Sequence, residues 1–321
     1  MKHLCLQLAS ALLFLPLALA QSPVTGSGTP NYVPLWTSSS NLGNSKIFQS
    51  GSYVTINHGL RVQSTASAPN IIGGFSGNSV ASGVVAATIA GGGATGGANV
   101  VNANFGTVGG GAANLASGGD STVGGGSANT ASGINATVPG GSLNLAQGTD
   151  SFAAGTNAQA LSGGAFVWGD DSTTSAVTDT GANSFVARAS GGVTFYSDSA
   201  LVSGVSLASG SGSWSSLSDR NAKDNLSPVD GRALLTALAN MPVSTWNYKT
   251  QSSSIRHMGP TAQDFHNAFG LGEDDKHISV VDADGAALAA VQALYRVVLE
   301  KERRIQDLEQ RLGQLEQMVG R

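Results

Sequence analysis

Apolar and small residues recur every 15 residues through the middle of the chain. The apolar row of this repeat consists of Val108, Val123, Val138, Ala153 and Trp168. A glycine row keeps the same interval, with Gly118, Gly133, Gly148 and Gly163. One unit of this length is too small to bury a core alone, so neighbouring units must stack as the coils of a solenoid.

Each unit has the sequence of very short strands joined by glycine turns. The segment Thr107-Val-Gly-Gly-Gly-Ala-Ala-Asn114 returns almost unchanged from Thr122 onward, and glycine takes positive φ without steric cost. We expect the valines to form an interior row, and the asparagines at positions 99, 114, 129 and 144 to bond the backbone of the next coil. A disordered glycine and serine linker is the alternative, but linkers do not hold valine at a fixed phase.

From Ser218 onward the pattern becomes that of a small α+β domain. Arg232 to Leu238 predicts a helix, and Val243 to Tyr248 predicts a strand with alternating exposure. The chain then ends in an apolar seam with steps of three and four residues, formed by Val291, Leu294, Val298, Lys301, Ile305, Leu308, Leu312, Leu315 and Val319. This seam predicts a coiled coil over about 287–319 that joins several chains, with a lone amphipathic helix as the alternative. Its a and d residues alone would favour two strands.

The expected fold is therefore mainly β, with a solenoid followed by a small α+β domain and a coiled coil. The predicted boundaries are 1–20 for an export signal, 21–72 for an N-terminal β fibre segment, 73–170 for the repeats, 171–217 for a β connector and 218–321 for the C-terminal domain.

The first residues have the pattern of a secretory signal. Lys2 supplies the positive start, Leu12 to Leu19 is almost wholly apolar, and Ala18-Leu19-Ala20 gives a small-x-small cleavage pattern. The apolar run is shorter than the roughly 20 residues that span a bilayer, and no later segment could span one, so we expect no transmembrane segment in the mature chain. This predicts a secreted or cell-surface protein that begins near Gln21. The single cysteine, Cys5, lies within the signal, so disulfides are not indicated.

The charged residues are concentrated in the C-terminal domain, and their distribution argues against some classes of ligand. Of the 36 charged residues 26 lie at or after Ser218, and no lysine or arginine falls between Arg61 and Arg188. With a net charge of −4, the chain has no basic surface for phosphates, so nucleic-acid binding is not expected. The three histidines of the C-terminal domain, His257, His266 and His277, lack metal-ligand spacing, and no metal or other cofactor is predicted.

The repeats resemble the head repeats of trimeric bacterial autotransporter adhesins. The resemblance covers roughly Gly91 to Gly169 and rests on the glycine, valine and asparagine phase. It implies a left-handed parallel β-roll in which three chains pack together. From this resemblance we also expect a ligand on a cell surface or a glycan ligand. That family ends in a membrane-embedded β-barrel anchor, and this chain shows no such pattern.

The segment from Ser218 resembles the C-terminal intramolecular chaperone and auto-processing domain of phage tailspikes, endosialidases and tail fibres. The resemblance is carried by Ser218-Asp-Arg-Asn-Ala-Lys-Asp-Asn-Leu226, Met241-Pro-Val-Ser-Thr-Trp-Asn-Tyr248 and Gly259-Pro-Thr-Ala-Gln-Asp264. It implies a homotrimer and a catalytic dyad. In this chain Ser218 would be the nucleophile and Lys223 the base. The bond Leu217–Ser218 would be cut, and Gln263 and Asp264 would support the dyad.

This chemistry is coherent, and a simpler interpretation stands beside it. A serine hydroxyl becomes nucleophilic when a neighbouring base takes its proton, and a lysine does so only when burial keeps it neutral. Folding and assembly could supply that burial. Alternatively, Ser218 and Asp219 cap a turn and Lys223 lies on a solvated face.

The sequence therefore predicts an exported, adhesin-like fibre whose C-terminal domain assembles the trimer and then cuts itself off in a single turnover, with no external substrate. A non-cleaving fibre with a C-terminal trimerisation cap is the first alternative. A polysaccharide-active spike is the weaker one, because the repeats carry only Asp120 and Asp150 as carboxylates, two periods apart.

Overall fold

The computed structural model describes residues 29–37, 41–50, 53–56 and 68–320. Contacts divide the chain into two units, Met1–Arg188 and Ala189–Arg321, and each is described by itself. The predicted export signal at 1–20 lies outside the described residues. In the first unit, strands β1 (Tyr32–Trp36), β2 (Leu42–Ser50) and β3 (Tyr53–Ile56) form an antiparallel sheet in the predicted N-terminal β segment.

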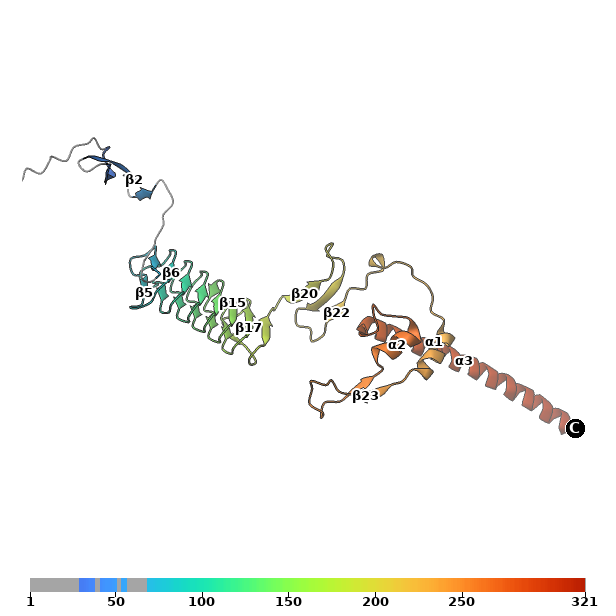
Figure 1. Cartoon of the computed structure of the whole chain (residues 1–321). Coiled ribbons are helices and arrows are strands. Elements are labelled where there is room, and N and C mark those ends of the chain that lie inside the picture. The colour runs from blue at the N-terminus through green and yellow to red at the C-terminus, as the bar shows by residue number, and fades with distance from the viewer. Residues whose placement is uncertain (1–28, 38–40, 51–52, 57–67, 321) are drawn as a thin grey trace, which may run out of the picture. The chain divides into compact units, whose positions relative to one another are not determined.

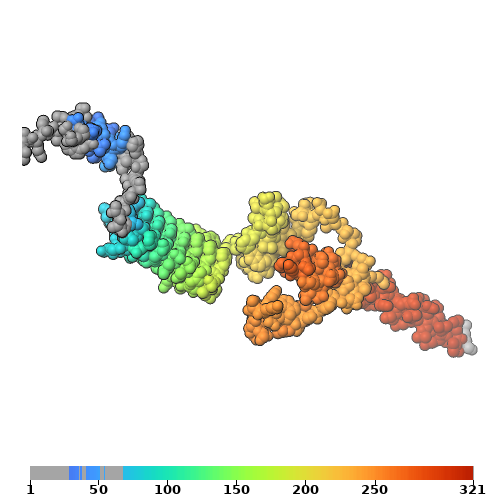
Figure 2. Space-filling model, viewed as in Figure 1, coloured from blue at the N-terminus to red at the C-terminus, as the bar shows by residue number. Residues whose placement is uncertain are grey.

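A parallel β-solenoid follows, as the 15-residue repeat predicts (Figure 1). One of its sheets pairs, in order, β19 (Phe185–Arg188), β17 (Phe166–Gly169), β15 (Phe152–Thr156), β12 (Thr137–Val138), β10 (Thr122–Val123), β8 (Thr107–Val108), β6 (Thr88–Ile89) and β4 (Ile71–Ile72), with β13 (Gly141–Ser142) also beside β15. The other pairs β18 (Val177–Thr178), β16 (Ala158–Ala160), β14 (Leu145–Ala146), β11 (Thr130–Ala131), β9 (Leu115–Ala116), β7 (Val100–Val101) and β5 (Ser79–Val80). The coils form a closely packed stack (Figure 2).

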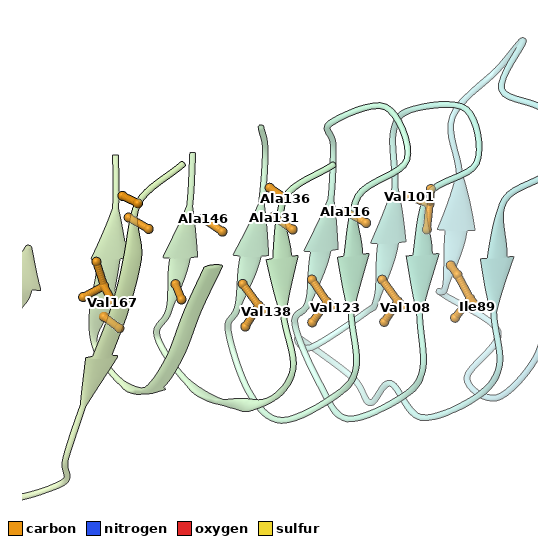
Figure 3. Close-up of a cluster of buried hydrophobic side chains, with 14 of the residues drawn as sticks. Ile89, Val101, Val108, Ala116, Val123, Ala131, Ala136, Val138, Ala146 and Val167 are labelled. Atoms are coloured by element: carbon orange, nitrogen blue, oxygen red, sulfur yellow. The ribbon is translucent and has the colours of Figure 1, made fainter. Parts of the chain in front are cut away.

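The interior of the solenoid is a row of small, buried apolar side chains between the two sheets (Figure 3). Val108, Val123 and Val138 are fully buried in the first sheet, as predicted, and alanines such as Ala116 and Ala131 are fully buried in the second. Small facing side chains are what allow two sheets to pack at a short separation. Each buried valine contributes about 1.5–3 kcal/mol relative to an exposed one.

The predicted asparagine ladder is present. Asn114 and Asn129 are buried, and the Oδ1 atom of Asn114 accepts a hydrogen bond from the backbone N–H of Asn129, at 3.1 Å. The Nδ2 atom of Asn114 donates to Gly110 O in its own coil, at 2.8 Å, and to Gly126 O in the next coil, at 3.0 Å. One buried amide therefore satisfies Asn129 N–H and Gly110 O and adds a second bond to Gly126 O, which also accepts from Ala112 N–H.

The predicted 15-residue interval fails after Ala153. The coil that starts at Phe152 is one residue shorter, because Phe152 pairs with Phe166 and Ala153 with Val167. Val167 is fully buried, and Trp168 points outward with 38% of its surface exposed. Trp168, which the 15-residue spacing aligns with Val108, Val123 and Val138, therefore does not take their interior place; Val167 does. The solenoid strands also continue to Arg188, past residue 170 where the repeat pattern ends.

The second unit begins with an antiparallel sheet of β20 (Gly192–Tyr196), β21 (Gly204–Ala208) and β22 (Ser215–Ser216). The C-terminal domain then contains the 3₁₀ helix η1 (Arg220–Ala222), α1 (Gly231–Asn240), β23 (Ser244–Trp246), β24 (His257–Gly259), α2 (Ala262–Phe269) and α3 (Val280–Val319). The predicted helix is present as α1 and the predicted strand as β23, although exposure along β23 does not alternate as predicted. Asp230 caps α1 by accepting hydrogen bonds from the N–H groups of Arg232 and Ala233.

Helix α3 is a single run of 40 residues with two different faces. The N-terminal part of α3 buries three small residues, Ala286, Ala290 and Ala293. Ala293 packs closely against α1, since a Cβ atom added to Gly231 would stand 2.6 Å from the Ala293 Cβ. Beyond this contact α3 projects from the domain (Figure 1). The predicted heptad seam is exposed in the single chain, from Val291, at 67%, to Leu315, at 53%. Among the described helices, α3 included, none is long and apolar enough to cross a membrane.

Candidate active site

The predicted scissile bond lies directly after the last strand of the β20–β22 sheet. Strand β22 pairs with β21, and the backbone N–H of Leu217 continues this pairing by donating to Gly204 O at 3.3 Å. Gly204 has φ +147°, and a Cβ atom there would stand 2.1 Å from Phe195 O on the neighbouring strand β20. The chain on the N-terminal side of the bond is thus fixed to a sheet, whereas the residues after it are exposed.

A pocket of about 400 Å³ opens beside the bond. Tyr196 and Leu201 contribute its apolar wall, and Leu217 and Ser218 lie in its lining. The loop that contributes Leu201 to the pocket is stabilised by Asp198. The Asp198 carboxylate accepts hydrogen bonds from the N–H groups of Ser203 and Val202, both at 3.0 Å. The N–H of Ser203, followed by that of Val202, stabilises the charged carboxylate and lowers the pKa of Asp198. No motif of the sequence points to this pocket, because strand pairing creates it.

The two residues of the predicted dyad are in contact. The Nζ atom of Lys223 donates a hydrogen bond to Ser218 Oγ at 2.6 Å. This separation is within the reach that proton transfer between a nucleophile and its base requires. Helix η1 lies between the two residues, so a spacing of five residues becomes a side-chain contact.

Both sequence interpretations of this segment describe part of the geometry. Asp219 does cap a turn, since its Oδ1 atom accepts from the backbone N–H of Asn221 at 3.0 Å, and both Ser218 and Lys223 are exposed in the single chain. The capping interpretation and the dyad interpretation are therefore compatible in this geometry. The catalytic roles of Ser218 and Lys223 stay predictions.

The two predicted supporting residues lie on α2, away from any hydrogen bond with the dyad. Thr261 caps this helix, and Asp264 is engaged in that cap: Thr261 Oγ1 donates to Asp264 Oδ2 at 2.7 Å and accepts from the Asp264 N–H at 3.1 Å. In the described part of the chain, no hydrogen bond joins Gln263 or Asp264 to Ser218 or Lys223. Their catalytic role also stays a prediction.

Metal chemistry has no support among the described residues, where no cluster of three or more histidine, cysteine, aspartate or glutamate side chains could hold an ion. His257 instead accepts or donates a hydrogen bond with Gln251 at 2.9 Å and packs against Trp246, with ring centroids 4.8 Å apart. His277 is paired with Asp274.

Comparison with known proteins identifies the C-terminal domain. Residues 218–270 match the family model Peptidase_S74, described as chaperone of endosialidase, and the match begins at Ser218. No curated protein and no solved structure matches the chain. The family is of the autoprotease type. A domain of this kind behind a repetitive β region has the organisation of a tail fibre with an intramolecular chaperone. The chain thus carries, after its β-solenoid, a C-terminal chaperone domain of the Peptidase_S74 family.

Proposed function

We propose that this protein is an exported homotrimeric fibre whose C-terminal domain assembles the fibre and then releases itself by cutting the Leu217–Ser218 bond. The observation that carries the proposal is the 2.6 Å contact between Lys223 Nζ and Ser218 Oγ. Ser218 is the first residue of the matched chaperone segment and lies two residues after the end of strand β22. The solenoid would form the body of the fibre, and the function of the fibre would be adhesion or recognition at a cell surface.

The exposed seam of α3 supports self-assembly. Val291, Val298 and Ile305 occupy a positions, and Leu294 and Leu308 occupy d positions. Each of these side chains is between 44% and 67% exposed in the single chain, which is costly for an apolar row in water. Burying the row against other copies of α3 removes that cost.

The charges beside the seam support a parallel arrangement of the helices. With Val291 as an a position, Arg304 and Arg311 fall at g, and Glu309 and Glu316 fall at e. In parallel, in-register helices a g residue lies near the e residue five positions later on its neighbour, which places each of these arginines beside a glutamate. Antiparallel helices would bring arginine to arginine and glutamate to glutamate. The choice of three chains rests on the resemblance to chaperone domains of trimeric fibres.

The cut would proceed by acyl transfer to the serine. Ser218 Oγ attacks the carbonyl carbon of Leu217, and its proton passes to the neutral amine of Lys223. The carbon–nitrogen bond of the peptide then breaks, and the amino group that leaves takes up the proton. Water hydrolyses the resulting ester, which gives a carboxylate at Leu217 and restores the serine. The attack could come from the residue's own hydroxyl or from the dyad of a neighbouring chain.

Assembly would control the timing of this reaction. A lysine is neutral near pH 7 only where it is desolvated, and Lys223 is exposed in the single chain. Neighbouring chains would have to cover the dyad before it could act. The cut would then follow trimer formation and mark its completion.

The decisive experiment is intact-mass analysis of the expressed protein under denaturing conditions, beside Ser218→Ala and Lys223→Ala variants. We expect the wild type to give a fragment that begins at Ser218 and both variants to stay whole. A wild type that stays whole as a stable oligomer would make the domain a permanent trimerisation cap and end the autoprotease proposal. The same spectra test export, because the exported chain should begin near Gln21.

A further inference from the structure

Ser218 and Lys223 lie closer together than they would in an extended chain. Five residues in extended conformation span roughly 17 Å, yet the two side chains meet at 2.6 Å. The chain must therefore fold back between them. The element that folds it back is η1, a single 3₁₀ turn.

This turn has little to hold it. Its backbone bonds join Ala222 N–H to Asp219 O and Lys223 N–H to Arg220 O, both at 3.2 Å. All residues from 218 to 230 are exposed, so no buried surface stabilises the turn. Short 3₁₀ segments have poor hydrogen-bond geometry and are marginal in water without further support.

Asp219 supplies that support. Its Oδ1 atom accepts from the backbone N–H of Asn221 at 3.0 Å and from the Asn221 side-chain Nδ2 at 3.2 Å. Among the described residues these are the side-chain hydrogen bonds of η1 itself, and both end on one carboxylate oxygen. The N–H group that Asp219 satisfies would otherwise be an orphan donor at the start of the helix.

We propose that Asp219 is a positioning residue for self-cleavage: by capping η1 it holds the turn that carries Lys223 to the hydroxyl of Ser218. This inference rests on the proposed function. Asp219 touches neither Lys223 nor the scissile carbonyl through any hydrogen bond of the described residues, so it acts through the backbone. An acceptor is what the cap requires, and a negative charge is dispensable.

That distinction defines the variants. Asp219→Asn keeps an Oδ1 acceptor and removes the charge, whereas Asp219→Ala removes both. Asp224→Ala is the matched control, because Asp224 is an exposed aspartate next to Lys223 and makes no side-chain hydrogen bond in the described part of the chain. In the full-length protein we expect Asp219→Ala to cleave roughly five- to tenfold more slowly, the size of effect that loss of a side-chain cap produces. Asp219→Asn and Asp224→Ala should stay within about twofold of the wild type.

A second measurement tests the turn without relying on cleavage. In a Ser218→Ala background, hydrogen exchange of the peptide that covers 218–226 should be faster with Asp219→Ala and unchanged with Asp219→Asn. Equal exchange and equal cleavage in all chains would overturn the role of Asp219. So would an Asp219→Asn chain as slow as Asp219→Ala, because the charge rather than the cap would then matter. A wild type that never cleaves would instead refute the proposed function, which keeps the two failures distinct.

Discussion

Adding one methyl group to the solenoid at Gly133 should break the contact between neighbouring coils. A Cβ atom on Gly133 would stand 2.0 Å from Gly148 O and 2.5 Å from the Gly148 carbonyl carbon, both in the backbone of the next coil. Real contacts of this kind exceed about 3 Å, so the coils must separate by about 1 Å. Two hydrogen bonds cross this place, from Ser132 N–H and Gly133 N–H to Ala146 O at 2.8 and 3.1 Å, and both would be lost. Overpacking costs about 1–3 kcal/mol and each of the two hydrogen bonds about 1 kcal/mol, so Gly133→Ala should destabilise the solenoid by about 3–5 kcal/mol.

The control is the same substitution at Gly125, a turn glycine of the same solenoid. A Cβ atom on Gly125 would meet no atom of the neighbouring coils within 4 Å, and this residue does not adopt positive φ. Gly125→Ala should therefore raise stability by about 0.4–1 kcal/mol, because alanine restricts the unfolded chain. Urea unfolding of the full-length chains, followed by circular dichroism of the β signal, measures both effects. Equal midpoints for the two variants would refute the close stacking of the coils.

Three further predictions concern the solenoid and the seam. Ser121 is fully buried and its hydroxyl has no hydrogen-bond partner among the described residues, so Ser121→Ala should raise the thermal midpoint by the equivalent of about 1 kcal/mol; a fall would reveal a partner. In an assembled coiled coil, Lys301→Leu would remove a ring of like charges from a d layer. Analytical sedimentation should then show self-association at least about tenfold tighter, whereas unchanged association would place Lys301 outside the seam. Deletion of 122–136 removes one whole coil and should leave a folded β spectrum, whereas deletion of 122–129 shifts the later strands out of phase and should abolish it.

The repeat made most of the solenoid predictable, because a strict period leaves few ways to bury a small unit. The period could not locate the shortened coil, since Val167 and Trp168 are adjacent and both apolar. The shortening lies at the glycine turn of the earlier coils: Thr137 pairs with Phe152, 15 residues later, but Gly141 pairs with Gly155, 14 residues later, so one residue is missing between Phe152 and Gly155. A one-residue change in a turn exchanges the inward and outward sides of the next strand.

Other turns went unpredicted because neighbours override local preference. Ala128 and Leu143 have φ of +54° and +61°, although positive φ is unfavourable for both residue types. Each is held by a backbone hydrogen bond to the preceding coil, from Ala128 N–H to Ala112 O and from Leu143 N–H to Ser127 O, both at 3.0 Å. These bonds exist only after the coils have stacked, so a local sequence pattern does not contain them.

The dyad shows the same division between local and assembled structure. The spacing of Ser218 and Lys223 was enough to predict their contact once the family pattern was recognised, because a capped turn of that length is a local structure. The pocket beside Leu217 depends on pairing between β20 and β21, so no motif marks it. In the proposed function, burial of the predicted dyad would depend on surfaces of other chains. The sequence of one chain does not encode those surfaces as a pattern.

A repetitive body explains why an assembly domain belongs at one end of this chain. Strands β8, β10 and β12 have the same sequence, Thr-Val, and pair in the same way with the coils before and after them. Two such solenoids that meet side by side gain almost the same contacts when one slides by a whole coil, so the repeats specify their mutual register weakly. Helix α3 does not repeat in this way. Its seam contains one lysine layer, and the arginines and glutamates beside the seam follow a defined order. Only one alignment of parallel copies pairs the lysine layers with each other and each arginine with a glutamate. In the proposed assembly, alignment through α3 would fix the register before the repeats pack. The domain would then have no further role in the body of the fibre, and a cut before Ser218 would leave that body intact.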